Sequence, residues 1–283
     1  MVIVRDKDFC MEKIAASGQC FRMNRAADGG WQIVAGDRLL RAYELGAEET
    51  EGSGLEPGFG GRLLCTEEEY RDFWSGYFDM DADYAAYREA VDPSDLFLTA
   101  ASEEGRGIRI LRQDPWEMLI TFIISQRKNI PAIKSCVESL CRKYGKRIED
   151  QAADGGFYYA FPSAEALAGA LDEDLRTCSL GYRAPYIKAT AIDAAADPEA
   201  LYRMAEMTNE ELLDALMRFK GVGVKVANCV SLFAYHRIDA FPVDVWISRM
   251  LEQYYPDGFP FERYSGFAGV MQQYMFFHAV SNK

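Results

Sequence analysis

The chain has 283 residues, 49% of them hydrophobic, and its 44 acidic and 31 basic residues give a net charge of −13. This length suits one large domain or two modest ones, and no apolar run is long enough to span a bilayer. The first residues lack the pattern of a signal peptide. We therefore expect a protein that is not secreted, located in a bacterial cytoplasm beside the nucleoid or, in a eukaryote, in the nucleus. Seven irregularly spaced cysteines argue against a disulfide framework and against a zinc site.

The acidic excess is concentrated in one part of the chain. Residues 44–104 hold 17 acidic and 3 basic side chains, whereas residues 105–147 hold 10 basic and 3 acidic ones. The field at a binding surface depends on where charges lie rather than on their total. A nucleic-acid partner is therefore compatible with the net charge, and we expect residues 44–104 to face away from it.

Residues 1–92 are predicted to form a β-rich N-terminal domain. Glycine turns at residues 28–30 and 36–37 separate short strand-forming runs, and these predict strands at residues 20–23, 31–35, 38–45 and 62–66. Such short turns favour an antiparallel sheet. Helices are expected next, at residues 70–77 and 82–90.

Residues 93–283 are predicted to form a helical domain. Asp114, followed by Pro115, begins one helix, and Asn129 begins another that ends near residue 145. Thr208, with Glu211 three residues later, is a capping-box pattern for a third helix start. The chain is therefore predicted to be α+β, with an antiparallel sheet domain followed by an all-α domain.

A Gly-Val-Gly turn at residues 221–223 joins the helix that begins after Thr208 to a second helix. Glycine tolerates positive φ, so the chain can turn tightly there. The arrangement is a helix-hairpin-helix. Its N–H groups and the positive end of the second helix form a site for one phosphate anion.

Two ionisable residues follow this hairpin. Lys225 lies in the first turn of the second helix, where the helix dipole disfavours a cation, and a nucleophilic amine has to be neutral. Asp244 comes after Pro242 and can cap a helix predicted at residues 245–254. Taken singly, each residue has an ordinary interpretation, as a solvated surface lysine and as an N-cap aspartate.

This part of the chain resembles the helix-hairpin-helix, Gly/Pro-Asp (HhH-GPD) family of DNA repair glycosylases, in particular the 8-oxoguanine glycosylases with lyase activity. The matching residues are Gly-Val-Gly-Val-Lys-Val-Ala-Asn-Cys at 221–229 and Phe-Pro-Val-Asp-Val at 241–245. The resemblance implies that Lys225 attacks the sugar and that Asp244 assists. No cysteine follows residue 229, which argues against the branches that carry an iron–sulfur loop near the C-terminus.

The resemblance also implies roles in base recognition. The carbonyl of Gly18, within Ser-Gly-Gln-Cys-Phe-Arg at residues 17–22, would accept a hydrogen bond from N7–H of the oxidised base. Gln272 would read the Watson–Crick edge, while Phe276 and Cys229 would cover the two flat sides of the base. From the residues alone, Gly18 is a strand-entry glycine and Phe276 is a core aromatic residue.

A further set of residues is implied to contact DNA. Asn129, which ends a loop containing Arg127 and Lys128, would enter the hole left by the extruded nucleotide, in addition to capping its helix. Tyr182 would intercalate beside the target and Arg183 would meet the opposite base; the alternative is a packed loop tyrosine with a solvated arginine. The remaining DNA contacts are assigned to Gly221, Gly223 and Trp246.

Three positions depart from the pattern of eukaryotic family members. Arg127 replaces an asparagine and Ala132 replaces an arginine, both of which face the orphaned cytosine, and Trp246 replaces a histidine that supports a phosphate contact. These changes leave the chemistry intact, but they predict relaxed selection of the opposite base.

The expected partner is double-stranded DNA that contains 8-oxoguanine. The protein is expected to act as a monomer and not to bind a membrane. No catalytic metal or redox cofactor is expected, although a monovalent cation at the hairpin is compatible with the fold. Two alternatives stay open: a monofunctional alkylbase glycosylase, against which Lys225 argues, and a non-catalytic helix-hairpin-helix DNA-binding protein.

Overall fold

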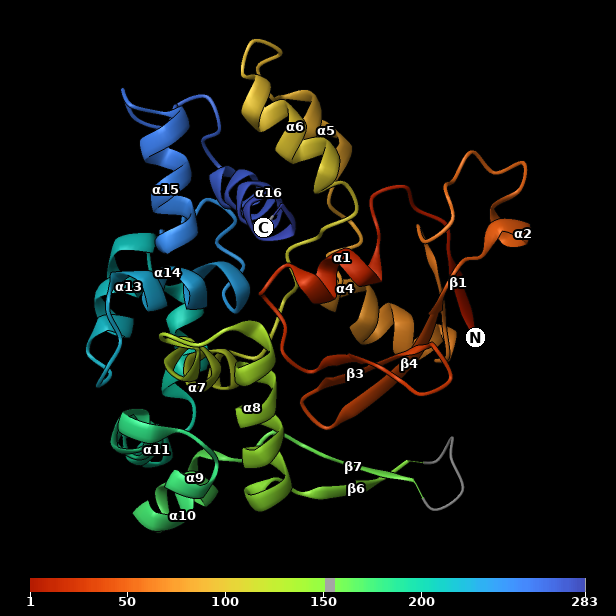
Figure 1. The fold of residues 1–283 in the computed structure, drawn as a ribbon. Helices are drawn as coiled ribbons and strands as arrows, with labels where there is room; N and C mark the ends of the chain where they lie inside the picture. Colours follow the sequence, from red (N-terminus) through yellow and green to blue (C-terminus); the bar gives the residue numbers. More distant parts are fainter. Residues whose placement is uncertain (151–155, 283) are drawn as a thin grey trace. The chain divides into compact units, whose positions relative to one another are not determined.

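The computed structural model of this chain describes residues 1–150 and 156–282. The chain divides into two compact units, and each is described by itself (Figure 1). The first, called the sheet unit, comprises Met1–Gln32, Leu40–Arg112 and His236–Lys283. The second, called the hairpin unit, comprises Ile33–Leu39 and Gln113–Tyr235.

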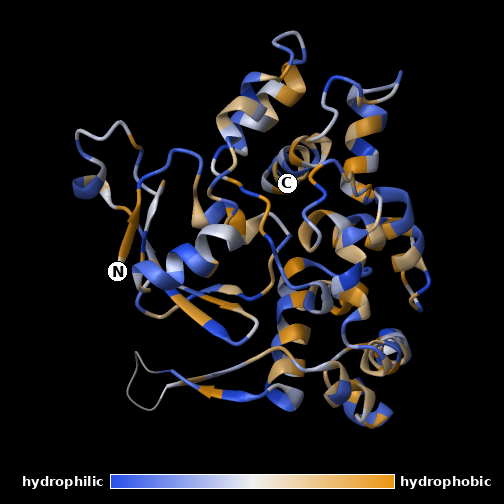
Figure 2. Cartoon of the chain, turned by 180° about the vertical axis from the view of Figure 1, so that it is seen from behind, coloured by the Kyte–Doolittle hydropathy of each residue, from blue (hydrophilic) through white to orange (hydrophobic). Residues whose placement is uncertain are grey.

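The sheet unit is built on a five-stranded sheet in the order β1-β5-β4-β3-β2, in which β5 pairs antiparallel with β1 and with β4. The strands are β1 (Val2–Val4), β2 (Met23–Arg25), β3 (Trp31–Ala35), β4 (Arg38–Glu44) and β5 (Gly61–Leu63). All three residues of β1 are apolar, as Figure 2 shows beside the N-terminus. The predicted N-terminal antiparallel sheet is confirmed.

Some strand boundaries differ from the prediction for local reasons. The strand expected at residues 62–66 ends at Leu63, because the side chain of Thr66 caps the next helix by accepting the N–H of Glu69 at 3.1 Å. The strand expected at residues 20–23 begins only at Met23. The strand β1 and a six-residue helix, α1, were not predicted, because such short elements contain too few residues to show a hydrophobic period.

Helices complete the sheet unit. They are α1 (Met11–Ala16), α2 (Ala47–Thr50), α3 (Glu67–Glu69), a π-helical turn η1 (Tyr70–Trp74), α4 (Ser75–Tyr77), α5 (Tyr84–Glu89), α6 (Leu96–Glu104), α15 (Val245–Tyr254) and α16 (Ala268–Ser281). The C-terminal helix α16 packs against both α6 and α15. This packing groups α6, α15 and α16 with the sheet, so the two units do not coincide with the predicted domains 1–92 and 93–283, and that boundary stays a prediction.

The hairpin unit is mainly helical. Its elements are α7 (Pro115–Ser125), α8 (Ile130–Tyr144), α9 (Ala164–Ala168), α10 (Asp172–Thr177), η2 (Gly181–Arg183), α11 (Ala184–Ala196), α12 (Ala200–Arg203), η3 (Met204–Glu206), α13 (Asn209–Met217) and α14 (Val224–Phe233). The predicted caps are confirmed, since Asp114 accepts the N–H of Glu117 and Asn129 accepts that of Ala132. One hairpin of β6 (Arg147–Glu149) and β7 (Phe157–Tyr159) interrupts the region predicted to be all helical.

A buried carboxylate ties together distant segments of the sheet unit. Asp79 is 4% exposed, and its side chain pairs with Arg112 Nη2 at 2.8 Å and with His236 Nε2 at 3.2 Å. It also accepts the hydroxyl of Tyr84 at 3.0 Å. Burial alone would raise the pKa of Asp79, but the hydrogen bonds and charges of His236 and Arg112 outweigh burial and hold the pKa below its usual value.

We expect Asp79→Asn to lower the free energy of unfolding at pH 7 by about 2 kcal/mol, because the buried carboxylate that pairs with the Arg112 guanidinium loses its charge. A carboxyl whose pKa falls on folding stabilises the protein above its unfolded pKa of about 3.9 and loses that effect as the pH falls through the folded pKa. The difference between the two proteins should therefore shrink below about pH 4. Urea unfolding of both proteins, at pH 7 and below about pH 4, measures this difference in the free energy of unfolding.

The matched control is Asp81→Asn, two residues away at an exposed position. It should unfold like the unmodified protein. Equal stability of Asp79→Asn and Asp81→Asn at pH 7 would contradict this account of the buried cluster.

Candidate functional site

The predicted helix-hairpin-helix lies in the hairpin unit, where α13 packs against α14. Thr208 and Glu211 form the predicted capping box at the start of α13. Gly221 has a φ of 84°, a conformation that glycine adopts without strain, and Gly223 is the N-cap of α14. Because a glycine N-cap offers no side-chain oxygen, the first N–H groups of α14 remain for a ligand anion.

Lys225 is the second residue of α14, as predicted, and it is half-buried rather than fully solvated. Its Nζ lies 5.4 Å from the centre of the Phe122 ring on α7. That ring stacks on Phe233 at the other end of α14, with ring centres 5.5 Å apart. The amine of Lys225 therefore lies over one ring of an aromatic pair, and Cys229 lies buried one turn farther along the same helix.

Asp244 belongs to the sheet unit and is the N-cap of α15. Its Oδ1 accepts the N–H groups of Trp246 and Ile247, each at 2.9 Å. The predicted capping role is therefore confirmed. Trp246 is half-buried, and the guanidinium carbon of Arg249 lies 5.4 Å from the centre of its ring.

Gln272 and Phe276 both lie on α16, which packs against the helix capped by Asp244. Gln272 is only 3% exposed, and its Nε2 donates to the carbonyl of Pro242 at 3.0 Å. This bond ties α16 to the segment that leads into Asp244. Phe276 is half-buried, and the roles of both side chains at a base stay predictions.

Gly18 follows a helix rather than entering a strand, so that local interpretation was wrong. Its φ is 74°, and it comes directly after Ser17, which ends α1. The next residue, Gln19, is fully buried and bonds the backbone of residues 109 and 111, donating to the first at 2.9 Å and accepting from the second at 2.8 Å. The segment around Gly18 is therefore held firmly within the sheet unit.

The loop between α7 and α8 presents three of the predicted DNA contacts. Asn129 caps α8 through the N–H of Ala132 at 3.0 Å, so its predicted capping role is confirmed. Arg127 is exposed and has a φ of 53°, which is uncommon for a residue with a side chain. Lys128 lies between them and is half-buried.

The structure reverses the alternative of a packed Tyr182 with a solvated Arg183. Tyr182 is 50% exposed, and Arg183 is the buried partner at 6% exposure. The Arg183 guanidinium donates to the carbonyls of Leu180 and Gln126. The interpretation of Arg183 as a solvated arginine was wrong, because its guanidinium is buried and donates to backbone carbonyls. Its role at the opposite base stays a prediction.

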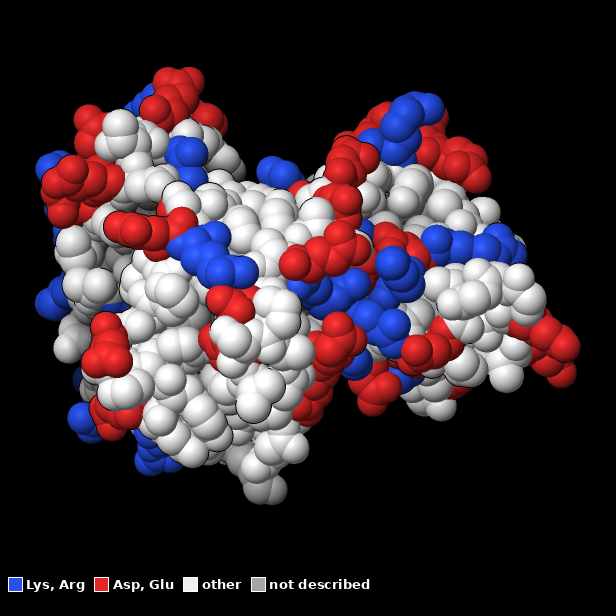
Figure 3. Space-filling model, turned by 90° about the horizontal axis from the view of Figure 1, so that it is seen from above, with Lys and Arg blue, Asp and Glu red and all other residues white. Residues whose placement is uncertain are grey.

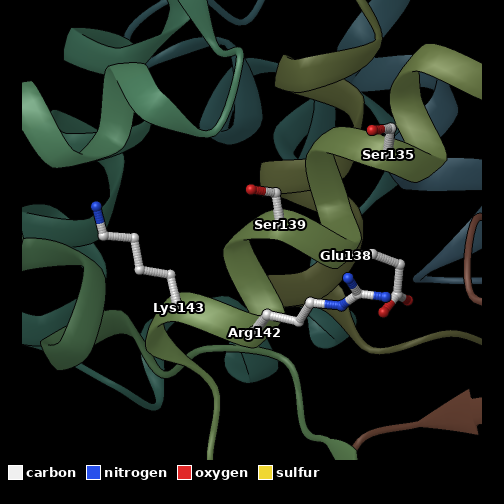
Figure 4. Close-up of a pocket in the computed structure, with 5 residues that line it drawn as sticks. All are labelled: Ser135, Glu138, Ser139, Arg142 and Lys143. Atoms are coloured by element: carbon white, nitrogen blue, oxygen red, sulfur yellow. The ribbon is translucent and has the colours of Figure 1, made fainter.

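A polar pocket of about 570 Å³ lies on α8, apart from the predicted site. Figure 4 shows its lining side chains on this one helix, with Arg142 and Lys143 directed to opposite sides: Ser135, Glu138, Ser139, Arg142 and Lys143. Lys143 bonds the carboxylate of Asp174 at 2.6 Å. Arg142 extends toward Glu138, one helical turn earlier, in the same view (Figure 4).

On the face in Figure 3, acidic and basic side chains lie in mixed groups, so neither sign covers it alone. Across residues 1–150 and 156–282, no helix is long and apolar enough to cross a membrane. Over the same residues, no cluster of three His, Cys, Asp or Glu side chains could hold a metal ion.

Comparison with known proteins gives matches along most of the chain. Residues 1–119 match the N-terminal domain of 8-oxoguanine DNA glycosylase, and residues 120–258 match the HhH-GPD superfamily of base excision DNA repair proteins. The fold is similar to the crystal structure of the Clostridium acetobutylicum 8-oxoguanine glycosylase/lyase in complex with double-stranded DNA containing cytosine opposite to 8-oxoguanine. That similarity has a TM-score of 0.85 and 32% identity, and covers 100% of this chain and 98% of that one.

Two relatives are similar in sequence. An N-glycosylase/DNA lyase of Saccharomyces cerevisiae is 38% identical over 191 residues, which are 63% of this chain and 50% of the yeast protein. A probable N-glycosylase/DNA lyase of Methanothermobacter thermautotrophicus is 29% identical over 231 residues, which are 71% of this chain and 72% of that relative. The match therefore spans half the length of the yeast relative. With both domains matched in order and a solved relative covered from end to end, the chain belongs to the 8-oxoguanine DNA glycosylases of the HhH-GPD superfamily.

Proposed function

We propose that this chain is a bifunctional DNA glycosylase that removes 8-oxoguanine from duplex DNA and cleaves the strand at the resulting site. The observation that carries the proposal is the position of Lys225, at the second residue of α14 directly after a glycine hairpin. An amine at that position can act on a sugar whose phosphate binds the hairpin. The names of the relatives, which join glycosylase and lyase, support both activities.

The damaged nucleotide has to leave the duplex first, because the bond to be broken is unreachable inside the base stack. The amine of Lys225 then forms a bond to C1′ of the sugar and gives up a proton, while the base leaves with the electron pair of the glycosidic bond and takes up a proton. Opening of the sugar ring gives a Schiff base between Lys225 and C1′. Loss of a proton from C2′ next expels the 3′ phosphate by β-elimination, which cleaves the strand.

Asp244 is assigned the stabilisation of positive charge during this reaction. A fixed carboxylate favours the cationic sugar and the developing charge on nitrogen more than the neutral ground state. Its Oδ1 is held by two N–H groups of α15, so the carboxylate is oriented before the substrate arrives. It can also accept and return a proton.

Base recognition is assigned to Gln272, Phe276, Cys229 and the carbonyl of Gly18. Normal guanine has a lone pair at N7 that a carbonyl repels, so a single acceptor distinguishes the oxidised base at a cost of about 1–3 kcal/mol for the wrong one. In the structure, Gln272 donates to the carbonyl of Pro242 and its Oε1 accepts from Gln273 Nε2 at 3.2 Å, so reading a base edge would use its second N–H and the second lone pair of Oε1. A monovalent cation at the hairpin and a monomeric state remain parts of the proposal.

We expect Lys225→Gln to lose both base release and strand cleavage on a duplex containing 8-oxoguanine, because a carboxamide cannot form the imine. Duplex binding should persist, since the hairpin N–H groups are unchanged. Single-turnover assays with excess enzyme measure the chemical steps, and fluorescence anisotropy measures binding.

Lys220→Gln is the matched control, an exposed lysine five residues earlier in the same motif. It should cleave at the normal single-turnover rate. Base release without strand cleavage by the unmodified protein would favour the monofunctional alternative, and binding without either step would favour a non-catalytic module. Continued nicking by purified Lys225→Gln would overturn the assignment of the nucleophile.

Asp244→Asn and Asp244→Ala separate the charge of this residue from its capping role. Asparagine still caps a helix, whereas alanine removes the cap and costs about 1 kcal/mol of stability. We therefore expect normal melting but a slow single-turnover rate for Asp244→Asn, and both defects for Asp244→Ala. If Asp244→Asn reacts at a near-normal rate, only the capping role survives.

Selection of the opposite base should be weaker than an arginine contact would provide, a contact that discriminates by about 1–3 kcal/mol. Ala132 has no donor, and Arg183 is held by two carbonyls. The measurement is single-turnover cleavage of 8-oxoguanine opposite each of the four bases. Ala132→Arg should sharpen the preference for cytosine. A cytosine preference of about a thousandfold in the unmodified protein, or about 4 kcal/mol, would contradict this expectation and point to Arg127 or Arg183 as reader.

A further inference from the structure

Gln126 links the loop in which it lies to two other loops of the hairpin unit. No sequence pattern indicated this role. It lies at the end of α7, immediately before Arg127. Its side-chain Nε2 donates to the carbonyl of Gly221 in the hairpin at 3.0 Å. Its own backbone carbonyl accepts a hydrogen bond from Arg183. One residue therefore touches the loops around residues 127–129, 181–183 and 221–223.

Arg183 anchors the second of these contacts. Burying a guanidinium is costly unless its N–H groups find acceptors, and Arg183 donates from its two terminal nitrogens to Gln126 and, at 3.2 Å, to Leu180, while its buried Nε has no partner among the described residues. Its guanidinium carbon also lies 4.4 Å from the centre of the Tyr182 ring. The charge of Arg183 thus joins the end of α7 to the exposed tyrosine.

Tyr186, on the first turn of α11, completes the arrangement from the other side. A Cβ placed on Gly221 would lie 2.4 Å from Cδ2 of Tyr186, so the ring packs directly on the hairpin backbone. The ring of Tyr186 also meets that of Tyr182 edge to face, with centres 6.1 Å apart. The contacts therefore close into a circuit, called here the contact ring: Gln126, Gly221, Tyr186, Tyr182 and Arg183.

Each of the three loops also contains a residue with positive φ beside or within the contact ring. The φ values are 53° at Arg127, 57° at Gly181 and 84° at Gly221. For Arg127, which has a side chain, this conformation persists only where surrounding contacts determine it. The hydrogen bonds of the preceding residue, Gln126, supply such contacts.

We propose that the contact ring holds the three loops as one preformed surface for the DNA backbone, with Gln126 as its positioning residue. The inference rests on the proposed function only in taking these loops as the DNA-binding ones. Loops fixed before binding lose less conformational freedom when DNA arrives, so affinity is gained without a new contact. Disturbing any one member should loosen all three loops together.

The test uses Gln126→Met, which keeps side-chain length but cannot donate, together with Tyr186→Leu and the double variant. Binding to an undamaged duplex is measured by fluorescence anisotropy. Each single variant should weaken binding about fivefold, and the double variant should weaken it by about the same factor, because members of one unit are not additive. Independent contacts would instead multiply to about 25-fold, and that result, or normal binding by Gln126→Met, would overturn the proposal.

Hydrogen exchange supplies a readout that a purely local role would not move. In Tyr186→Leu, amide exchange should accelerate at residues 127–129 as well as at 221–223. Arg203→Met, which removes the exposed Arg203–Asp197 ion pair in the same unit, is the control and should change neither binding nor exchange at these loops. Acceleration confined to residues 221–223 would refute the coupling.

Binding to an undamaged duplex and processing of 8-oxoguanine are measured separately. An undamaged duplex requires no base release, so failure of the unmodified protein to process 8-oxoguanine would sink the proposed activity and leave the binding comparison intact. Conversely, normal 8-oxoguanine release with strictly multiplicative binding defects would reject the contact ring alone.

Discussion

The backbone conformation of Gly221 is the constraint on which the hairpin unit depends. At a φ of 84°, and with the Tyr186 ring occupying the space of a Cβ, this position admits glycine without strain and no other residue. The turn lets α14 fold back on α13, which sets Lys225 in the first helical turn beside Phe122. It also aims the Gly221 carbonyl at Gln126. The placement of Lys225, the proposed nucleophile, and the contact between the hairpin and Gln126 thus follow from one turn.

Both units contain a buried charge that fastens segments distant in sequence. In the sheet unit Asp79 joins Arg112 and His236, and in the hairpin unit Arg183 joins the end of α7 to its own loop. Buried charges are costly unless paired, so such groups specify one arrangement of the chain rather than adding much stability. Here both sit at loops and segment ends, where hydrophobic packing alone would leave the backbone free to shift.

Local signals in the sequence predicted much of the fold. Asp114, Asn129, Thr208 and Asp244 all cap helices at the expected positions, because a cap and its first turn are encoded within four residues. Partners far apart in sequence could not be found this way. Nothing near Gln126 indicates a bond to Gly221, 95 residues away, and nothing near Arg183 indicates burial. The sequence therefore named the candidate site residues, whereas the long-range contacts that hold their loops were visible only in the structure.

The proposed reaction depends on a covalent bond between Lys225 and the sugar. Its most direct test is borohydride reduction during reaction with a duplex containing 8-oxoguanine, followed by proteolysis and mass spectrometry of the cross-linked peptide. If Lys225 is the nucleophile, a stable protein–DNA adduct should form, with the modification on Lys225. An adduct at another amine, such as Lys128 or Lys220, or no adduct while the strand is still cleaved, would contradict it.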